Sequence, residues 1–297
     1  MVMNIQSTDH IFTFSKEHRA IRSVPVGKEV TFHTLDAFSN QIVDETSTFD
    51  KIDMNAVNPA TGPVFVDDAK PGDALKVEIV SIDLDSQGVM AVAPGLGVLG
   101  DQVDRFQSKL MDVRDDHVIF RDEISFPVRK MVGVIGVAPT GEAVSCGTPG
   151  NHGGIMDNTS MTEGSTVYFP VSCDGALFAL GDVHAAMGDG EVCVTGVEIA
   201  ARVTVKFSVV KEEINLPWLE TSDSWQVIAS AETFEEAAKR AASEWTTFLA
   251  TRSRLTSEEA MMLLSASSNL EICQAVNPLK TVRLKMPKSV LQQTGVE

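Results

Sequence analysis

Apolar and polar residues alternate through most of the first 210 residues of this chain. "EVTFHTL" (29–35) and "ALKVEIVSI" (74–82) place apolar side chains at every second position, which is typical of strands that bury one face. Glycine and proline interrupt the pattern at short intervals, as in "PVGKEV" and "KPGDALKV", where a tight turn leads into a strand. The pattern predicts a β-rich body over residues 1–210, with sandwich-like or barrel-like sheets.

Helical spacing replaces the alternation in the last third of the chain. Segment 233–252 begins with a threonine and two glutamates and then carries an apolar stripe, which is typical of a capped amphipathic helix. A second helix is expected at 256–267, which begins with a T-x-x-E capping box, and a closing strand at 279–287. The sequence therefore predicts an α+β fold, in which residues 211–297 pack on the body as one globular unit.

Charge and composition exclude several kinds of partner. The chain carries 24 Lys and Arg against 41 Asp and Glu, a formal net charge of −17. Such a chain repels phosphate backbones and anionic lipid surfaces, so we expect no nucleic-acid and no membrane partner. It shows no apolar run long enough for a membrane-spanning helix and no signal-peptide pattern. Its four cysteines form no C-x-x-C pair, and we expect reduced thiols in a cytoplasmic protein.

One glycine motif resembles a dinucleotide site. "GLGVLG" (95–100) matches G-x-G-x-x-G, and Asp122 follows at about the distance of a ribose-binding acid. Pro94 stands directly before the first glycine, and the surrounding strands are expected to be antiparallel, without a second βαβ unit. These features argue against a nucleotide site.

Two glycine-rich loops carry the chemistry of the chain. "CGTPGNHGGIMDN" (146–158) and "GDVHAAMGDGE" (181–191) flank a run, 166–180, that we interpret as a hairpin. Such a hairpin would bring both loops to one end of a sheet. The polar residues that would meet there are His152, Asp157, Asp182, His184, Asp189 and Glu191.

Imidazole and carboxylate side chains are the usual ligands of a catalytic divalent ion, and a further carboxylate can move a proton. The spacing matches no H-E-x-x-H motif, so surface turns and a core histidine remain alternatives. Cys146 lies six residues before His152 and suggests a thiol nucleophile, although a buried or incidental cysteine is the simpler interpretation.

The chain resembles the acetamidase/formamidase family along most of its length. The resemblance rests on these segments, in order: "LDAFSNQI" (35–42), "NPATGPVFVDDAKPGDALKVEI" (58–79), "PGLGVLGD" (94–101), "VGVIGVAP" (132–139), "NHGGIMDN" (151–158), "GSTVYFPV" (164–171), "GALFALGDVHAAMGDGEV" (175–192) and "LKTVRLKMPKSV" (279–290). It implies hydrolysis of short carboxamides to carboxylate and ammonia by a homodimer or larger homo-oligomer. It also implies a divalent metal ion, for which we expect zinc before calcium. Cys146 has no counterpart in this pattern and receives no role.

The chemistry of the loops leads to specific expected roles. His152 and His184, with Asp157 or Asp182, would hold the ion, whose water would attack the amide carbonyl. Glu191 would be the general base and then the proton donor to ammonia. Two alternatives remain: a non-catalytic protein that binds a metal or small ligand, and a metal-free amidase with a carboxylate dyad.

Further residues are expected to contact the substrate. Asp36, which ends a strand, and the backbone amides of Gly153 and Gly154 would orient the amide or stabilise the oxyanion. Asn58, in a rigid turn, would line the same pocket. The predicted catalytic residues are thus Glu191, His184, Asp157 and Asp36, and the predicted substrate-binding residues are Gly153, Gly154 and Asn58.

Overall fold

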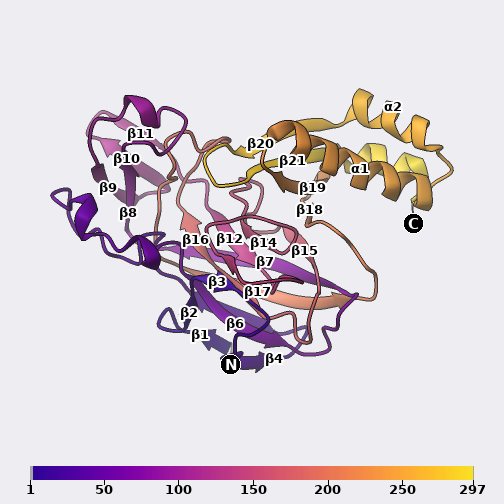
Figure 1. Cartoon of the computed structure of the whole chain (residues 1–297), viewed down its shortest axis with the longest axis horizontal. Helices are drawn as coiled ribbons and strands as arrows, with labels where there is room; N and C mark the ends of the chain where they lie inside the picture. Colours follow the sequence, from indigo (N-terminus) through magenta and orange to yellow (C-terminus); the bar gives the residue numbers. More distant parts are fainter. Residues whose placement is uncertain (1–2, 297) are drawn as a thin grey trace.

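The computed structural model describes residues 3–296, and its largest element is an open nine-stranded sheet (Figure 1). Its neighbouring strands are antiparallel except for the parallel pair β1–β5. In order across the sheet the strands are β1 (Met3–Ile5), β5 (Glu29–His33), β17 (Ala201–Val210), β7 (Ala74–Leu84), β15 (Thr166–Pro170), β18 (Trp218–Glu220), β19 (Ser224–Ala231), β21 (Lys280–Pro287) and β20 (Asn269–Gln274).

A six-stranded sheet packs against the first one and carries the two glycine-rich loops. In order its strands are β14 (Gly153–Ile155), β12 (Met131–Gly136), β16 (Phe178–His184), β6 (Ala60–Val66) and β2 (His10–Ile11), with β4 (Arg22–Val24) paired to β6. All residues of β12 and β16 are buried, because these central strands have protein on both faces.

The remaining strands and helices are peripheral. A four-stranded sheet contains β11 (Ile124–Pro127), β10 (His117–Arg121), β9 (Gln107–Arg114) and β8 (Gln87–Val92), and β13 (Val144–Ser145) pairs with β3 (Thr13–Phe14). Three short 3₁₀ turns, η1 (Phe49–Lys51), η2 (Met54–Ala56) and η3 (Gly100–Gln102), lie in connecting segments. The helices are α1 (Phe234–Arg252), α2 (Ser257–Ser267) and α3 (Lys288–Leu291), and η4 (Gln292–Thr294) follows α3.

Aromatic side chains from both large sheets form the main core between them. Phe178 of β16 contacts Phe32 of β5 and Phe207 of β17, with ring centroids 5.6 and 5.0 Å apart. All three side chains are fully buried. The alternation predicted a sandwich-like or barrel-like body, and the structure is of the sandwich kind: the nine-stranded sheet ends in the edge strands β1 and β20 and does not close.

The C-terminal helices cover the far end of the nine-stranded sheet (Figure 1). Thr233 and Thr256 cap α1 and α2 as predicted, and Thr256 forms the capping box with Glu259. Trp245 of α1 is fully buried against this sheet and donates a hydrogen bond to the carbonyl oxygen of Leu284, at 2.8 Å. The α+β prediction, with helices packed on a β-rich body and a closing strand, is confirmed. Within residues 3–296, no helix has the length and apolar character of a membrane span.

The predicted hairpin at 166–180 is wrong. β15 pairs with β7 and β18 in the nine-stranded sheet, whereas β16 pairs with β12 and β6 in the six-stranded sheet. The run therefore crosses from one sheet to the other. Its two strands face each other across the core, to which β15 contributes Phe169 and β16 contributes Phe178. The glycine-rich loops still meet, since β14 and β16 are both neighbours of β12.

The glycine motif at 95–100 is a turn at the end of β8. Gly95 donates a backbone hydrogen bond to Gly100, and Val98 donates one to Val192, so the motif closes on itself and lies beside the second glycine-rich loop. β8 pairs antiparallel with β9, which agrees with the argument against a nucleotide site.

Candidate active site

Strand β16 ends in the centre of the candidate site. Asp182 and His184 lie two residues apart on it, and both are almost completely buried. The backbone of His184 forms an isolated antiparallel bridge with Glu198, which brings that carboxylate beside the imidazole ring. The Nε2 atom of His184 lies 3.0 Å from Oε2 of Glu198 and 3.5 Å from Oδ1 of Asp182.

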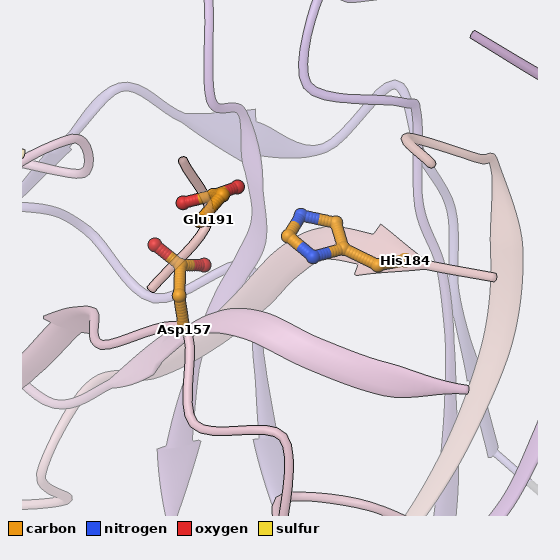
Figure 2. A group of neighbouring side chains, drawn as sticks. All are labelled: Asp157, His184 and Glu191. Carbon is orange, nitrogen blue, oxygen red and sulfur yellow. The ribbon is translucent and has the colours of Figure 1, made fainter. Parts of the chain in front are cut away.

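Two groups of possible ligand atoms share His184. Asp157, His184 and Glu191 form the first group, and their ligand atoms all lie within 4.8 Å of one another. Figure 2 shows the carboxylates of Asp157 and Glu191 facing each other beside the imidazole ring. Asp182, His184 and Glu198 form the second group by the same distance criterion. All five residues are buried.

Unusual backbone conformations direct three of these carboxylates inward. Asp157, Asp182 and Glu191 have positive φ values of 46°, 53° and 47°, a conformation that non-glycine residues rarely adopt. Gly133 of β12 leaves the space that the side chains occupy. A Cβ atom on this glycine would lie 2.5 Å from Oδ1 of Asp157 and 2.6 Å from Oδ2 of Asp182.

Burial and mutual repulsion raise the pKa values of the acids. Burial, followed by the charge of Asp182, raises the pKa of Asp157 to about 7 and that of Glu198 to about 8, although nearby His184 opposes the shift. The pKa of Glu191 is well above its usual value for the same reason, with Asp157 as the main repelling charge. Burial alone would lower the pKa of His184, but the carboxylates of Glu198 and Asp182 hold it well above its usual value.

The residues present fit a divalent cation. Four buried carboxylates surround one imidazole, so full ionisation would leave an excess of negative charge that only protons or a cation can balance. Nδ1 of His184 and Oδ1 of Asp157 are buried without a hydrogen-bond partner, while Nε2 of His184 has the carboxylates of Glu198 and Asp182 beside it. Nitrogen and oxygen donors of this kind suit zinc, and the abundance of carboxylate oxygens also suits calcium.

A small cavity opens beside the two groups. Its volume is about 110 Å³, and Asp182, Glu191 and Glu198 form part of its wall. The rest of the lining is mainly apolar and includes Phe38, Phe49, Ile52, Val57 and Phe106. A larger groove of about 610 Å³ lies between α1 and the strands β18 and β19, and none of the five buried residues of the two groups lines it.

Two asparagines are among the neutral polar residues of this cavity. Asn58 and Asn277 both line it. The side chain of Asn277 donates a hydrogen bond from Nδ2 to Oδ2 of Asp157, at 2.7 Å. The backbone N–H of Asn58 donates a hydrogen bond to the carbonyl oxygen of Ala37, which fixes the turn before β6.

Of the predicted metal ligands, the structure brings together Asp157, Asp182 and His184, and it places Glu191 with them. His152 belongs to neither group. Its ring packs edge-on against Phe14, with centroids 5.3 Å apart, and burial lowers its pKa to about 4.

Three further predicted residues, Asp36, Gly153 and Gly154, do not line the cavity. Asp36 accepts hydrogen bonds from the backbone N–H groups of Phe38 and Asn40, at 2.9 and 2.7 Å, and so shapes the loop that begins the cavity wall. The backbone N–H of Gly153 donates a hydrogen bond to the carbonyl oxygen of Gly150, within the same turn. Gly154 follows it on β14 with a φ of 79°.

Glu198 and Asn277 were not predicted as site residues. Glu198 lies in the alternating segment "EVCVTGVEI", where a polar residue is expected to face solvent. Asn277 lies in the turn between β20 and β21, far along the chain from the loops. One signal could have found it: the tetrapeptide Ala-Val-Asn-Pro occurs at 56–59 and again at 275–278, and both of its asparagines line the cavity.

Fold and site together define an α+β protein with a buried carboxylate–histidine centre beside a cavity of small-molecule size. The profile of the acetamidase/formamidase family matches residues 13–146 and 141–292, and the chain belongs to this family.

Solved structures with high similarity cover the whole chain. An acetamidase from Bacillus halodurans is 46% identical, with a TM-score of 0.97 over 99% of this chain and 100% of its own. A predicted acetamidase/formamidase from Thermoanaerobacter tengcongensis is 44% identical, with a TM-score of 0.98 over 100% of this chain and 99% of its own. Among curated relatives, a formamidase of Methylophilus methylotrophus is 24% identical, and the match covers 65% of this chain and 62% of the relative. The chain thus spans less than two thirds of that relative's length.

Proposed function

We propose that the protein hydrolyses small linear carboxamides, of the acetamide or formamide type, to the carboxylate and ammonia. The observation that carries this proposal is the buried group of Asp157, His184 and Glu191, of which Glu191 lines a small cavity. Family membership and the acetamidase and formamidase names of the relatives support the choice of substrate.

The size and lining of the cavity agree with a small amide. A volume of about 110 Å³ is well below the several hundred Å³ of a site for drug-sized ligands. The apolar wall, which includes Ile52 and Phe106, suits a short hydrocarbon chain, while Asn58 and Asn277 can hydrogen-bond to the amide group.

We propose a divalent ion as the cofactor, with zinc as the first choice and calcium as the second. Asp157 and His184 would hold it from the first group, with Asp182 and Glu198 as further ligands from the second. Two buried atoms that could coordinate an ion, Nδ1 of His184 and Oδ1 of Asp157, have no hydrogen-bond partner, which supports this assignment. Such an ion supplies Lewis-acid polarisation of the amide carbonyl and activation of water.

Glu191 is the proposed general base. Its carboxylate would accept a proton from the water that attacks the carbonyl carbon, since it lines the cavity and lies within 4.8 Å of the ligand atoms of Asp157 and His184. It would then donate the proton to the amide nitrogen as the C–N bond breaks and ammonia leaves. Asn277 would keep Asp157 in place through their hydrogen bond during both steps.

A metal-free form of the same reaction is the second candidate. It is favoured by the facing carboxylates of Asp157 and Glu191, since two such groups with raised pKa values can share a proton (Figure 2). Chelation separates the two forms. Ammonia release that stops with EDTA and returns with zinc supports the metal-dependent form, and release that EDTA leaves unchanged supports the dyad.

The proposed reaction is tested by ammonia release from formamide, acetamide and propionamide, with zinc or calcium supplied. Glu191→Gln is expected to lower kcat by 10²- to 10⁴-fold, whereas Glu258→Gln on the exposed face of α2 leaves it unchanged. A wild-type protein that releases no ammonia from any of the three amides refutes the proposal for this substrate class. A Glu191→Gln variant with wild-type kcat refutes only the role of Glu191.

We further propose a homodimer or larger homo-oligomer and a cytoplasmic location. Val98, Leu99 and Val192 are 53%, 57% and 62% exposed, and the hydrogen bond between Val98 and Val192 holds these apolar side chains in one region. This exposed apolar region supports a contact with a second copy. Light scattering of the purified protein tests the oligomer, and cell fractionation tests the location.

A further inference from the structure

Arg283 is a buried arginine on β21 that no step of the proposed reaction uses. It is 4% exposed and lies between β19 and β20, opposite Ile228 and Glu271 in the register of the sheet. A buried cation is costly unless it is paired and hydrogen-bonded. Its partners therefore show what this charge stabilises.

One end of the guanidinium group joins two loops. Nη1 donates to Oδ1 of Asn158 at 3.0 Å and to Oγ1 of Thr159 at 3.1 Å. Nη1 and Nη2 donate to both carboxylate oxygens of Asp189, at 3.1 and 2.6 Å. Thr159 completes the network with a hydrogen bond to Asp189 at 2.7 Å.

These loops carry two acids of the candidate site. Asn158 directly follows Asp157, and Asp189 stands two residues before Glu191. The ligand atoms of Asp157 and Glu191 lie within 4.8 Å of each other, although their charges repel. The bidentate contact with Asp189 and the bond to Asn158 oppose this repulsion, because they fix the two chain segments at one distance.

The other end of Arg283 leads away from the site. Its Nε atom donates to Oε2 of Glu271 on the neighbouring strand β20. The same arginine thus makes one ion pair that reaches the site loops and one that stays within the sheet. The side chains of Asp189 and Glu271 are partly exposed, 43% and 30% respectively, so removing either charge is expected to leave a folded protein.

We propose that Arg283 is a positioning residue, which holds loops 157–159 and 188–191 together and thereby sets the spacing of the Asp157 and Glu191 carboxylates. The expected effects on ion binding and turnover rest on the proposed function. The expected effect on loop order does not.

The experiment compares Asp189→Asn with Glu271→Gln in the full-length protein. Each variant removes one carboxylate charge from the same arginine, but only Asp189→Asn loosens the loops. We expect Asp189→Asn to weaken zinc binding at least tenfold by calorimetry and to lower kcat more than it raises KM. Amide hydrogen exchange is expected to accelerate in segments 157–161 and 188–191. Glu271→Gln is expected to match the wild type in all three measurements.

The outcomes separate the two proposals. Equal effects of Asp189→Asn and Glu271→Gln on hydrogen exchange in the two loops overturn the positioning role, whatever the activity. If the wild type binds no zinc and releases no ammonia, the proposed function fails, and hydrogen exchange still decides the role of Arg283. Arg283→Lys keeps the charge but loses the two-pronged contact, and it is expected to fall between the wild type and Arg283→Gln in loop protection.

Discussion

Asn277 hydrogen-bonds to Asp157 at 2.7 Å, although 120 positions of the chain separate the two residues. Gln274 supports the turn that carries this asparagine, because its side-chain oxygen accepts the backbone N–H groups of Val276 and Asn277. The turn between β20 and β21 therefore holds the side chain of Asn277 against the carboxylate of Asp157, which follows β14 of the six-stranded sheet.

Replacing this asparagine is expected to impair turnover more than folding. Asn277→Ala leaves Oδ2 of Asp157 without its donor, at a cost of about 1–3 kcal/mol, and we expect kcat to fall about tenfold or more. The measurements are steady-state ammonia release and urea unfolding. Asn269→Ala, at the exposed start of β20, is the matched control. Wild-type kcat in Asn277→Ala would contradict a role for this hydrogen bond in the site.

A methyl group at Gly133 is expected to disrupt the site, because it would displace two of the buried carboxylates. Its Cβ would meet carboxylate oxygens of Asp157 and Asp182 at 2.5 and 2.6 Å, which is far inside van der Waals contact. We expect Gly133→Ala to weaken zinc binding and to lower activity by at least tenfold. Gly141→Ala is the control, because a Cβ there meets no atom within 4 Å. Zinc calorimetry on both variants checks the prediction, and equal affinities would show that the two carboxylates can shift without loss.

The metal-free protein is expected to lose stability as the pH rises from about 4 to about 8. Burial raises the pKa of Asp157 to about 7 and that of Glu198 to about 8, above the values near 4 of an unfolded chain. Groups with raised pKa values stabilise the fold fully below the unfolded pKa, and this contribution is lost as the pH rises through the folded pKa. The raised pKa of His184 acts in the same direction.

We expect a fall of several kcal/mol over this range in the presence of EDTA, since each pKa unit of difference between folded and unfolded protein is worth about 1.4 kcal/mol. Calorimetric Tm values at pH 5.5 and 8.5 measure it. Asp157→Asn should flatten the dependence, because it removes one of the titrating groups. A chelated wild type that becomes more stable between these pH values would contradict the raised pKa values.

Cys146 is expected to have no part in the reaction. It is fully buried in a small apolar cluster with Phe14 and Val134, and burial raises the pKa of its thiol to about 12. A thiol of this kind provides almost no thiolate at neutral pH. Cys146→Ala should keep wild-type kcat and lose about 1 kcal/mol of stability through the space it leaves. Loss of activity in a variant that remains folded by circular dichroism would restore the thiol hypothesis.

Local signals in the sequence were sufficient for the helices and for much of the site. Thr233 and Thr256 mark the starts of α1 and α2 because helix caps depend on neighbouring residues only. Asp157 and His184 stand in glycine-rich segments whose glycines and acids already indicate a polar site.

Contacts between residues far apart in the chain could not be predicted from these local signals. Alternation cannot distinguish a hairpin at 166–180 from two strands in facing sheets, because the apolar pattern of β15 and β16 is the same in both cases. Glu198 occupies a position that alternation assigns to solvent, and only its bridge to His184 turns it toward the ring. Asn277 depends on a contact between distant parts of the chain, which periodicity does not report.

The place of Asn277 and Arg283 on the β20–β21 hairpin sets an order of events during synthesis. The ribosome makes the acids at 157–198 first, and about eighty further residues follow before the amide and the guanidinium that hold them exist. Until then the nascent chain carries repelling carboxylates without their restraints. The carboxylate–histidine centre can therefore reach the geometry described above only after translation has passed residue 283.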